Sequence, residues 1–141
     1  MEMINALQAA AREDGAPEWD QSKEPCLHYD RDQGIPGYFA RQVSLYPDKA
    51  AIVCDQRSLT YADLDRLSIG IARFLAAAGV GKGDIVALLV PRSLEAVVAK
   101  LAVLRAGAAY APIDPAYPDE HIGHILSECE PKVILVFDEL R

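Results

Sequence analysis

Three short apolar runs in the second half of the chain alternate with two helical patterns, and this alternation limits the fold more than any other feature. The runs are Ile85–Val90, Ala109–Ile113 and Val133–Phe137. The segments between them repeat apolar residues at helical spacing, one starting near Ser93 and the other at Pro118. Strands that lack inside–outside alternation and are joined by helices are typical of parallel sheets. The pattern therefore predicts an α/β fold with a Rossmann-like parallel sheet that is buried on both faces.

Upstream of these runs, the sequence predicts a small antiparallel hairpin between two helices. A helix begins at Pro36, and the extended runs Ala50–Cys54 and Arg57–Thr60 follow it. Thr60 has the hydroxyl that an N-cap needs, and Gly79 suits the left-handed position that ends many helices. We therefore expect the second helix between Thr60 and Gly79. Its apolar stripe consists of Leu64, Leu67, Ile71, Phe74, Leu75 and Ala78.

The predicted sheet lacks cover on one side. Consecutive right-handed crossovers that run in the same direction leave their helices on one face of a sheet. We expect the helix that starts at Thr60 to cover part of the other face. The strand at Val133–Phe137 is as apolar as an interior strand, and no second strand follows it to flank it. The sequence therefore predicts an incomplete portion of a larger sheet.

The front of the chain has a different composition from the rest. Residues 1–32 contain eight acidic and three basic residues and so carry −5 of the net charge of −7. Gly15, Pro17 and Pro25 interrupt this stretch, which has few apolar pairs. We predict an acidic linker at residues 1–34, with a short helix near Ile4–Ala11, and the N-terminal portion of a folded domain at residues 35–141.

Composition and charge exclude several classes of partner. The chain is 51% hydrophobic and 25% charged, which is typical of soluble globular domains. Its negative charge repels nucleic acid and anionic lipid, and its longest apolar run is far shorter than the roughly 20 residues of a membrane span. The three cysteines form no C-x-x-C pair, which favours reduced thiols. We expect a cytoplasmic protein that binds neither nucleic acid nor a membrane.

A glycine-rich segment at residues 79–84 has the composition of a phosphate-binding loop but not its position. Such a loop connects a strand to the N-terminus of a helix, where free amides bind phosphate. Here the segment leaves a helix and enters a strand, and neither Ser nor Thr follows Lys82-Gly83. We interpret the segment as a turn.

The other polar candidates also favour structural roles. His121, His124 and Glu128 have a helical spacing that suits a metal ion, but we expect them on the solvated side of a helix. Asp114 follows a strand, where α/β sheets place functional groups, yet Pro115 comes next and favours a turn. The sequence therefore predicts no catalytic, cofactor-binding or metal-binding residue in this chain.

Two segments have distinctive sequences: Leu-Thr-Tyr-Ala-Asp-Leu at residues 59–64, and Leu-Arg-Ala-Gly-Ala-Ala-Tyr-Ala-Pro-Ile-Asp-Pro at residues 104–115, followed by Tyr117-Pro118. They resemble the first and second core motifs of the adenylation domains of nonribosomal peptide synthetases, within the acyl-adenylate-forming, or AMP-binding, superfamily. The resemblance implies a scaffold role for the motif residues. These are Leu59, Thr60, Tyr61, Leu64, Leu104, Ala106, Gly107, Ala109, Tyr110, Pro112, Asp114, Pro115, Tyr117 and Pro118.

The resemblance also implies an enzyme that activates a carboxylic acid, usually an amino acid. In that family, Mg-ATP and the amino acid give an aminoacyl adenylate and pyrophosphate, and the acyl group then passes to the phosphopantetheine thiol of a carrier protein. The family's phosphate loop, nucleotide-binding residues and catalytic lysine all lie beyond the second motif. The resemblance therefore implies that this chain holds no cofactor and is inactive alone. Its implied partners are the rest of the adenylation domain, in cis or in trans, and a carrier protein.

Three alternatives stay open at this point. The chain is one half of a split adenylating enzyme, in which a second polypeptide completes the sheet. It is instead a non-catalytic interaction module that docks a partner strand beside Val133–Phe137. The third alternative is a truncated reading frame with no function of its own.

An incomplete sheet predicts that the purified chain is marginally stable or self-associates. Apolar strand faces that stay in water favour marginal stability and self-association. We expect gel filtration to show oligomers and thermal unfolding to be broad. A monodisperse monomer with a sharp, cooperative unfolding transition would contradict this expectation.

Overall fold

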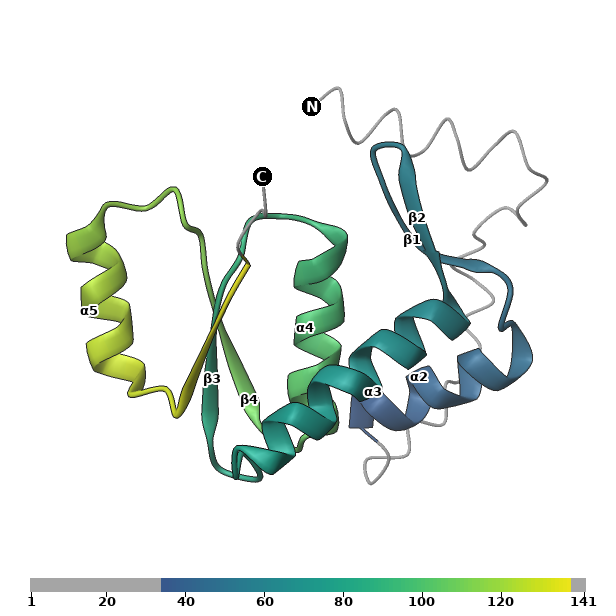
Figure 1. Ribbon diagram of the computed structural model, residues 1–141, viewed down its shortest axis with the longest axis horizontal. Helices are drawn as coiled ribbons and strands as arrows, with labels where there is room; N and C mark the ends of the chain where they lie inside the picture. Colours follow the sequence, from purple (N-terminus) through teal and green to yellow (C-terminus); the bar gives the residue numbers. More distant parts are fainter. Residues whose placement is uncertain (1–33, 138–141) are drawn as a thin grey trace, which may run out of the picture. The chain divides into compact units, whose positions relative to one another are not determined.

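The computed structural model describes residues 34–137, so the predicted helix at Ile4–Ala11 and nearly all of the predicted linker lie outside the described residues. The chain follows the predicted order of elements (Figure 1). These are α2 (Gly34–Leu45), β1 (Ala50–Cys54), β2 (Arg57–Thr60), α3 (Tyr61–Ala77), β3 (Ile85–Leu89), α4 (Leu94–Arg105), β4 (Ala109–Ile113), α5 (Asp119–Cys129) and β5 (Val133–Val136). The predicted α/β class is confirmed.

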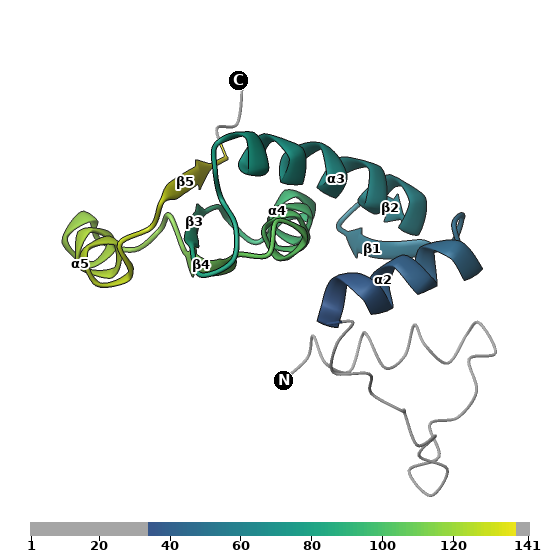
Figure 2. The same ribbon diagram turned by 90° about the horizontal axis from the view of Figure 1, so that it is seen from below.

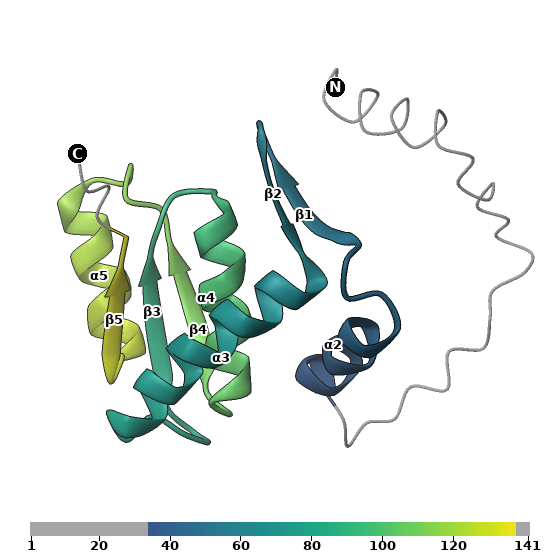
Figure 3. The ribbon, with the colours of Figure 1, turned by 45° about the vertical axis from the view of Figure 1, so that its right-hand side comes forward.

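Two separate sheets are present in the described part of the chain. Strands β1 and β2 form an antiparallel pair, as the hairpin prediction required. Strands β3, β4 and β5 form a parallel sheet in the order β4-β3-β5, so β3 lies in the centre (Figure 3). The register places Val86 of β3 level with Tyr110 of β4 and Val133 of β5.

The placement of the helices differs from the prediction. The connection from β3 to β4 moves one strand along the sheet, and the connection from β4 to β5 crosses back past β3. Right-handed crossovers in opposite directions place their helices on opposite faces, and α4 and α5 indeed flank the sheet from opposite sides (Figure 2). Helix α3 packs on α4 and shares its face of the sheet, so the prediction that it covers the other face is wrong.

The core lies between β3 and the α3–α4 pair. Val86 and Leu88 of β3 pack with Leu75 of α3 and with Ala99 and Val103 of α4. A second cluster joins α3 and α4 to the hairpin and to α2, and its buried members are Leu64, Val98 and Leu101. The predicted burial on both faces holds for β3, whose three central residues are buried.

The two outer strands are far more exposed than β3. In β5, Val133 and Leu135 pack against the core, whereas Ile134 and Val136, on the opposite face, are 44% and 63% exposed. Helix α5 has no fully buried residue and leaves these two side chains open to solvent. Strand β5 thus combines the apolar composition of an interior strand with a free edge and a largely uncovered face.

Lys132, directly before β5, ties that strand to the turn before β3. Its Nζ donates to the carbonyl of Gly79 at 2.6 Å and to Oδ2 of Asp84 at 2.9 Å. The same carboxylate oxygen accepts the amide of Gly81 at 2.8 Å, and the amide of Lys132 donates to the carbonyl of Ile85 at 2.9 Å. The hydrogen bond from Lys132, together with that from Gly81, holds the pKa of Asp84 below its ordinary value of 3.8. This cluster fixes where β5 begins beside β3.

Replacing Lys132 by Met should raise the pKa of Asp84 toward 3.8, because the charged donor is lost. A carboxylate whose pKa is lower in the folded than in the unfolded state stabilises the fold above its unfolded pKa, and this contribution disappears as the pH falls through the folded pKa. The stability difference between wild type and K132M should therefore be largest at about pH 7 and should shrink as the pH falls through the folded-state pKa of Asp84, which lies below 3.8. A carbon NMR titration of Asp84 and urea unfolding at each pH measure the two effects.

The matched control is Lys82→Met, which removes an exposed lysine from the same turn. Within residues 34–137, Lys82 takes part in no ion pair. We expect K82M to leave the pKa of Asp84 unchanged. An unshifted Asp84 in K132M would refute the role assigned to the Lys132 ammonium.

Candidate functional site

The first distinctive segment spans the junction of β2 and α3. Thr60 caps α3, because its Oγ1 accepts the amide of Asp63 at 3.1 Å, as the sequence predicted. The hydroxyl in turn donates to Oδ2 of Asp63 at 2.7 Å. This hydrogen bond, with a further one from Arg66, lowers the pKa of the Asp63 carboxyl from its ordinary value. The Thr60 hydroxyl and the Asp63 carboxylate thus stabilise one another at the start of α3.

The apolar and aromatic residues of the same segment join the hairpin and α2 to the core. Leu64 is buried between α3 and α4, and Leu59 of β2 packs against that cluster. The ring of Tyr61 lies 5.8 Å from the ring of Phe39 in α2, measured between centroids. The amide of Tyr61 donates to the carbonyl of Lys49 at 3.0 Å. The segment therefore connects three elements around one helix start.

The second distinctive segment ends α4 and forms β4. Leu104 lies in the last turn of α4, Ala106 is its C-cap, and Gly107 follows with a φ of 80°, a left-handed conformation that favours glycine. The amide of Ala109 then donates to the carbonyl of Asp84 at 2.9 Å, which starts the pairing of β4 with β3. The segment thus sets the place at which β4 enters the sheet.

The second segment ends in a turn that contains the exposed residue Asp114. Oδ1 of Asp114 accepts the amide of Ala116 at 2.9 Å, and its carbonyl accepts the amide of Tyr117 at 3.1 Å. Pro118, predicted as the first residue of this helix, is instead the N-cap of α5, and the Tyr117 ring meets the His121 ring edge-on at 5.1 Å. The motif residues of both segments thus occupy caps, turns, strands and core positions, although their scaffold role stays a prediction.

Two ion pairs secure α4 to the elements that precede it in the chain. Arg57 of the hairpin forms a two-pronged pair with Glu95, at 2.7 Å and 3.0 Å, and this contact lowers the pKa of Glu95. Arg105 pairs with Asp65 of α3, and its guanidinium lies over the Phe39 ring at 5.5 Å. These pairs hold the hairpin and α2 against the α3–α4 unit.

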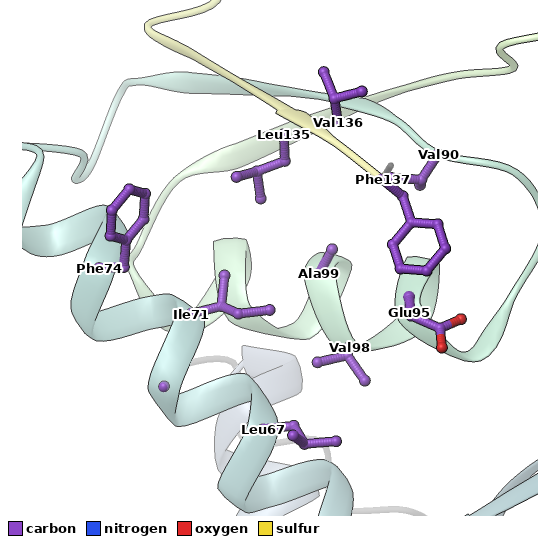
Figure 4. Close-up of a pocket in the computed structure, with 11 residues that line it drawn as sticks. Leu67, Ile71, Phe74, Val90, Glu95, Val98, Ala99, Leu135, Val136 and Phe137 are labelled. Atoms are coloured by element: carbon purple, nitrogen blue, oxygen red, sulfur yellow. The ribbon is translucent and has the colours of Figure 1, made fainter. Parts of the chain in front are cut away.

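An apolar groove of about 450 Å³ runs between α3, α4 and β5. Figure 4 shows Leu135 and Phe137 pointing down from β5 toward Ile71 and Ala99, whereas Val136 points away. Phe74, on the rim, is 64% exposed, so its predicted place in an inward-facing apolar stripe is wrong. Glu95 is the single charged residue of the lining.

A smaller crevice of about 230 Å³ opens at the carboxyl ends of β3 and β4. Its lining includes Arg92 from the β3–α4 loop, Lys100 from α4, and Asp114 and Tyr117 from the β4–α5 loop. Sequence reasoning missed this crevice, because Arg92 and Lys100 belong to neither of the two distinctive segments and lie far from Asp114 along the chain. A useful signal would have been a cation directly after an apolar strand.

The structure places the remaining sequence candidates in ordinary structural settings. Residues 79–84 form a turn between α3 and β3, as predicted, with Gly79 and Gly83 in left-handed conformations. His121, His124 and Glu128 are exposed on α5. Within residues 34–137, no three His, Cys, Asp or Glu side chains are grouped to hold a metal ion. In that same range, every helix is too short or too polar to cross a bilayer.

Comparison with known families assigns this fold. The model of the family described as "AMP-binding enzyme" matches residues 39–141. The chain belongs to this family. As a member of the AMP-binding family, it carries the two core motifs in the places described above, and the resemblance predicted from those motifs is confirmed.

Curated relatives of this AMP-binding chain are peptide synthases. Tyrocidine synthase 3 of Brevibacillus parabrevis is 42% identical over 118 residues, which cover 84% of the chain and 2% of the relative. A dimodular nonribosomal peptide synthase of Bacillus subtilis is 44% identical over 101 residues, or 72% of the chain and 4% of the relative. The chain therefore spans only a few per cent of the length of these relatives.

A solved structure shares the fold of this AMP-binding chain. The N-terminal subdomain of Klebsiella oxytoca NpsA, in complex with 3-hydroxyanthranilyl-AMSN, superposes with a TM-score of 0.68 and 31% identity. The match covers 74% of this chain and 27% of the NpsA subdomain. An artificially fused adenylation–PCP di-domain, NpsA–ThdA, gives a TM-score of 0.69 and 32% identity, over 74% of this chain and 20% of the fusion. The chain thus corresponds to a part of an adenylation domain's N-terminal subdomain.

Removing the Thr60 cap should loosen the start of α3. Thr60→Ala deletes the acceptor for the Asp63 amide, a change that costs about 1 kcal/mol in typical helices. Amides in the first turn of α3 should then exchange with solvent about five times faster, as measured by hydrogen exchange. Thr60→Ser keeps the acceptor and should exchange like wild type, and Ser58→Ala, on the exposed side of the hairpin, should have no effect. Equal protection in T60A and T60S would contradict the cap.

Proposed function

We propose that this chain is the N-terminal segment of an adenylation domain that activates an amino acid. In the complete enzyme, a carboxylate oxygen of the amino acid attacks the α-phosphorus of ATP and pyrophosphate leaves. A carrier-protein thiol then attacks the acyl carbon of the adenylate, and AMP leaves with the bonding electrons. The observation that carries the proposal is the match to 27% of the NpsA N-terminal subdomain, with both motifs at structural junctions.

The described residues do not fit a site for Mg-ATP. Two connections run from the carboxyl end of a strand to a helix, Val90–Ser93 and Asp114–Pro118, and neither contains glycine. The Asp114 carboxylate is engaged by the Ala116 amide at 2.9 Å. The nucleotide, the magnesium ion and the phosphopantetheine arm therefore belong, in this proposal, to residues beyond the described ones. We expect the 141-residue chain alone to be inactive.

The free edge of β5 favours one further candidate, a split adenylating enzyme. Within residues 34–137 no other strand pairs with this edge, so its backbone groups are available for pairing, and the apolar groove lies beside it. The occupant that fits both is the rest of the adenylation domain, with a strand that pairs with β5 and an apolar helix that fills the groove. About three quarters of the NpsA subdomain lies outside the matched segment, so material for this cover exists in the relative. We also propose a cytoplasmic location, which suits the free thiols of Cys54 and Cys129.

A chimera tests the adenylation proposal. The matched segment of Klebsiella oxytoca NpsA is replaced by residues 39–137 of this chain, and substrate-dependent exchange of pyrophosphate into ATP is measured. We expect exchange in the chimera and none in the 141-residue chain by itself. A chimera that elutes as a folded monomer but shows no exchange would overturn the proposal.

A matched pair of valine variants tests the docking of a second polypeptide in trans. Val136 of β5 and Val53 of β1 are 63% and 69% exposed, so an aspartate at either position leaves the core unchanged. The chain is mixed with the product of the neighbouring gene, and exchange and co-elution are followed. We expect V136D to abolish both and V53D to retain both. If the wild-type chain shows neither exchange nor co-elution, the split enzyme is refuted and a truncated reading frame is favoured. Co-elution without exchange would instead favour the interaction module.

A further inference from the structure

The carboxyl ends of β3 and β4 lie side by side in the sheet, and their connections leave on opposite faces. The chain leaves β3 toward α4 on one face of the sheet, and it leaves β4 toward α5 on the other face (Figure 2). Because neighbouring connections diverge to opposite faces, a crevice opens between them above the strand ends. Open α/β sheets bind their ligands outside the carboxyl ends of their strands.

The crevice of about 230 Å³ lies at these strand ends. Residues that follow β3 form one wall, residues at the end of β4 and after it form another, and two side chains of α4 close it. These are Val90, Pro91 and Arg92, then Pro112, Ile113, Asp114 and Tyr117, and finally Ala96 and Lys100. The crevice therefore arises from the topology of the sheet and not from a single loop.

Two cations in the crevice lack partners of their own. Within residues 34–137, Arg92 and Lys100 form neither an ion pair nor a side-chain hydrogen bond, whereas Arg57, Arg105 and Lys132 all donate to carboxylates. The one acidic side chain in the lining, Asp114, already accepts an amide hydrogen bond within its own turn. The crevice thus has an excess of one positive charge and two sets of free donors.

We propose that this crevice binds the anionic group of a small molecule, either a phosphate or a carboxylate. A guanidinium binds two oxygens of such a group in one plane, and an ammonium adds a point charge beside it. Pro91, Pro112 and Tyr117 supply apolar walls for the rest of the ligand. The proposal does not rest on the adenylation function, because Arg92 and Lys100 line neither the apolar groove nor a site that the proposed function assigns to the nucleotide.

Equilibrium dialysis of the full 141-residue chain against labelled inorganic phosphate and, separately, labelled acetate tests the proposal. We expect saturable binding of at least one anion, and the two arms identify which class of group is preferred. The double variant R92Q/K100Q should weaken binding at least about tenfold, because it removes both charged donors. The control R41Q/K82Q makes the same change of charge at exposed sites away from the crevice, and it should bind within about twofold of wild type.

Two results would overturn the proposal. One is the absence of saturable binding for both anions. The other is an equal loss of binding in R92Q/K100Q and R41Q/K82Q, which would show attraction by net charge alone. Single variants R92Q and K100Q, with circular dichroism matched to wild type, exclude a loss through unfolding. Amide NMR shifts on anion addition should map to Ser93, Lys100 and Tyr117, and shifts confined to the turn at Lys82 would also refute the site.

Discussion

The packing of α3 and α4 on one face of β3 is the contact on which the other elements depend. Val86 and Leu88 turn toward these helices, and Leu75 and Val103 close the core without exposure. Burial of apolar surface is the main stabilising term in folding, and here it is concentrated in a single strand and two helices. The hairpin, α2 and both outer strands attach to this unit and bury little by themselves.

Directional contacts then fix how those peripheral elements attach. The Arg57–Glu95 pair orients the hairpin on α4, and Lys132 with Asp84 fixes the start of β5 beside β3. Exposed ion pairs contribute little free energy, so we assign them a role in register and orientation. Thr60 connects the peripheral elements to the core, because it belongs to β2 and also caps the helix that supplies Leu64 and Leu75 to the core.

Sequence patterns predicted the elements well because their boundaries depend on local chemistry. Thr60, Ser93 and Gly107 act as caps through hydrogen bonds or backbone angles within a few residues, so their roles are visible in the sequence. Strand order is different, because apolar composition does not state on which side of β3 a strand pairs. The same reason explains why the position of α3 and the burial of Phe74 were predicted wrongly. Helical spacing shows which residues share one face of a helix, but not which element covers that face.

One topological choice explains the unforeseen features together. Because the connection after β4 crosses back past β3, α5 lies on the face opposite α4, and β5 becomes an edge with apolar residues on both faces. The same crossing makes the connections after β3 and β4 diverge, which opens the crevice lined by Arg92 and Lys100. The uncovered edge at β5 and the cationic crevice beside β4 are therefore both consequences of this one crossover connection, and they lie on opposite sides of β3.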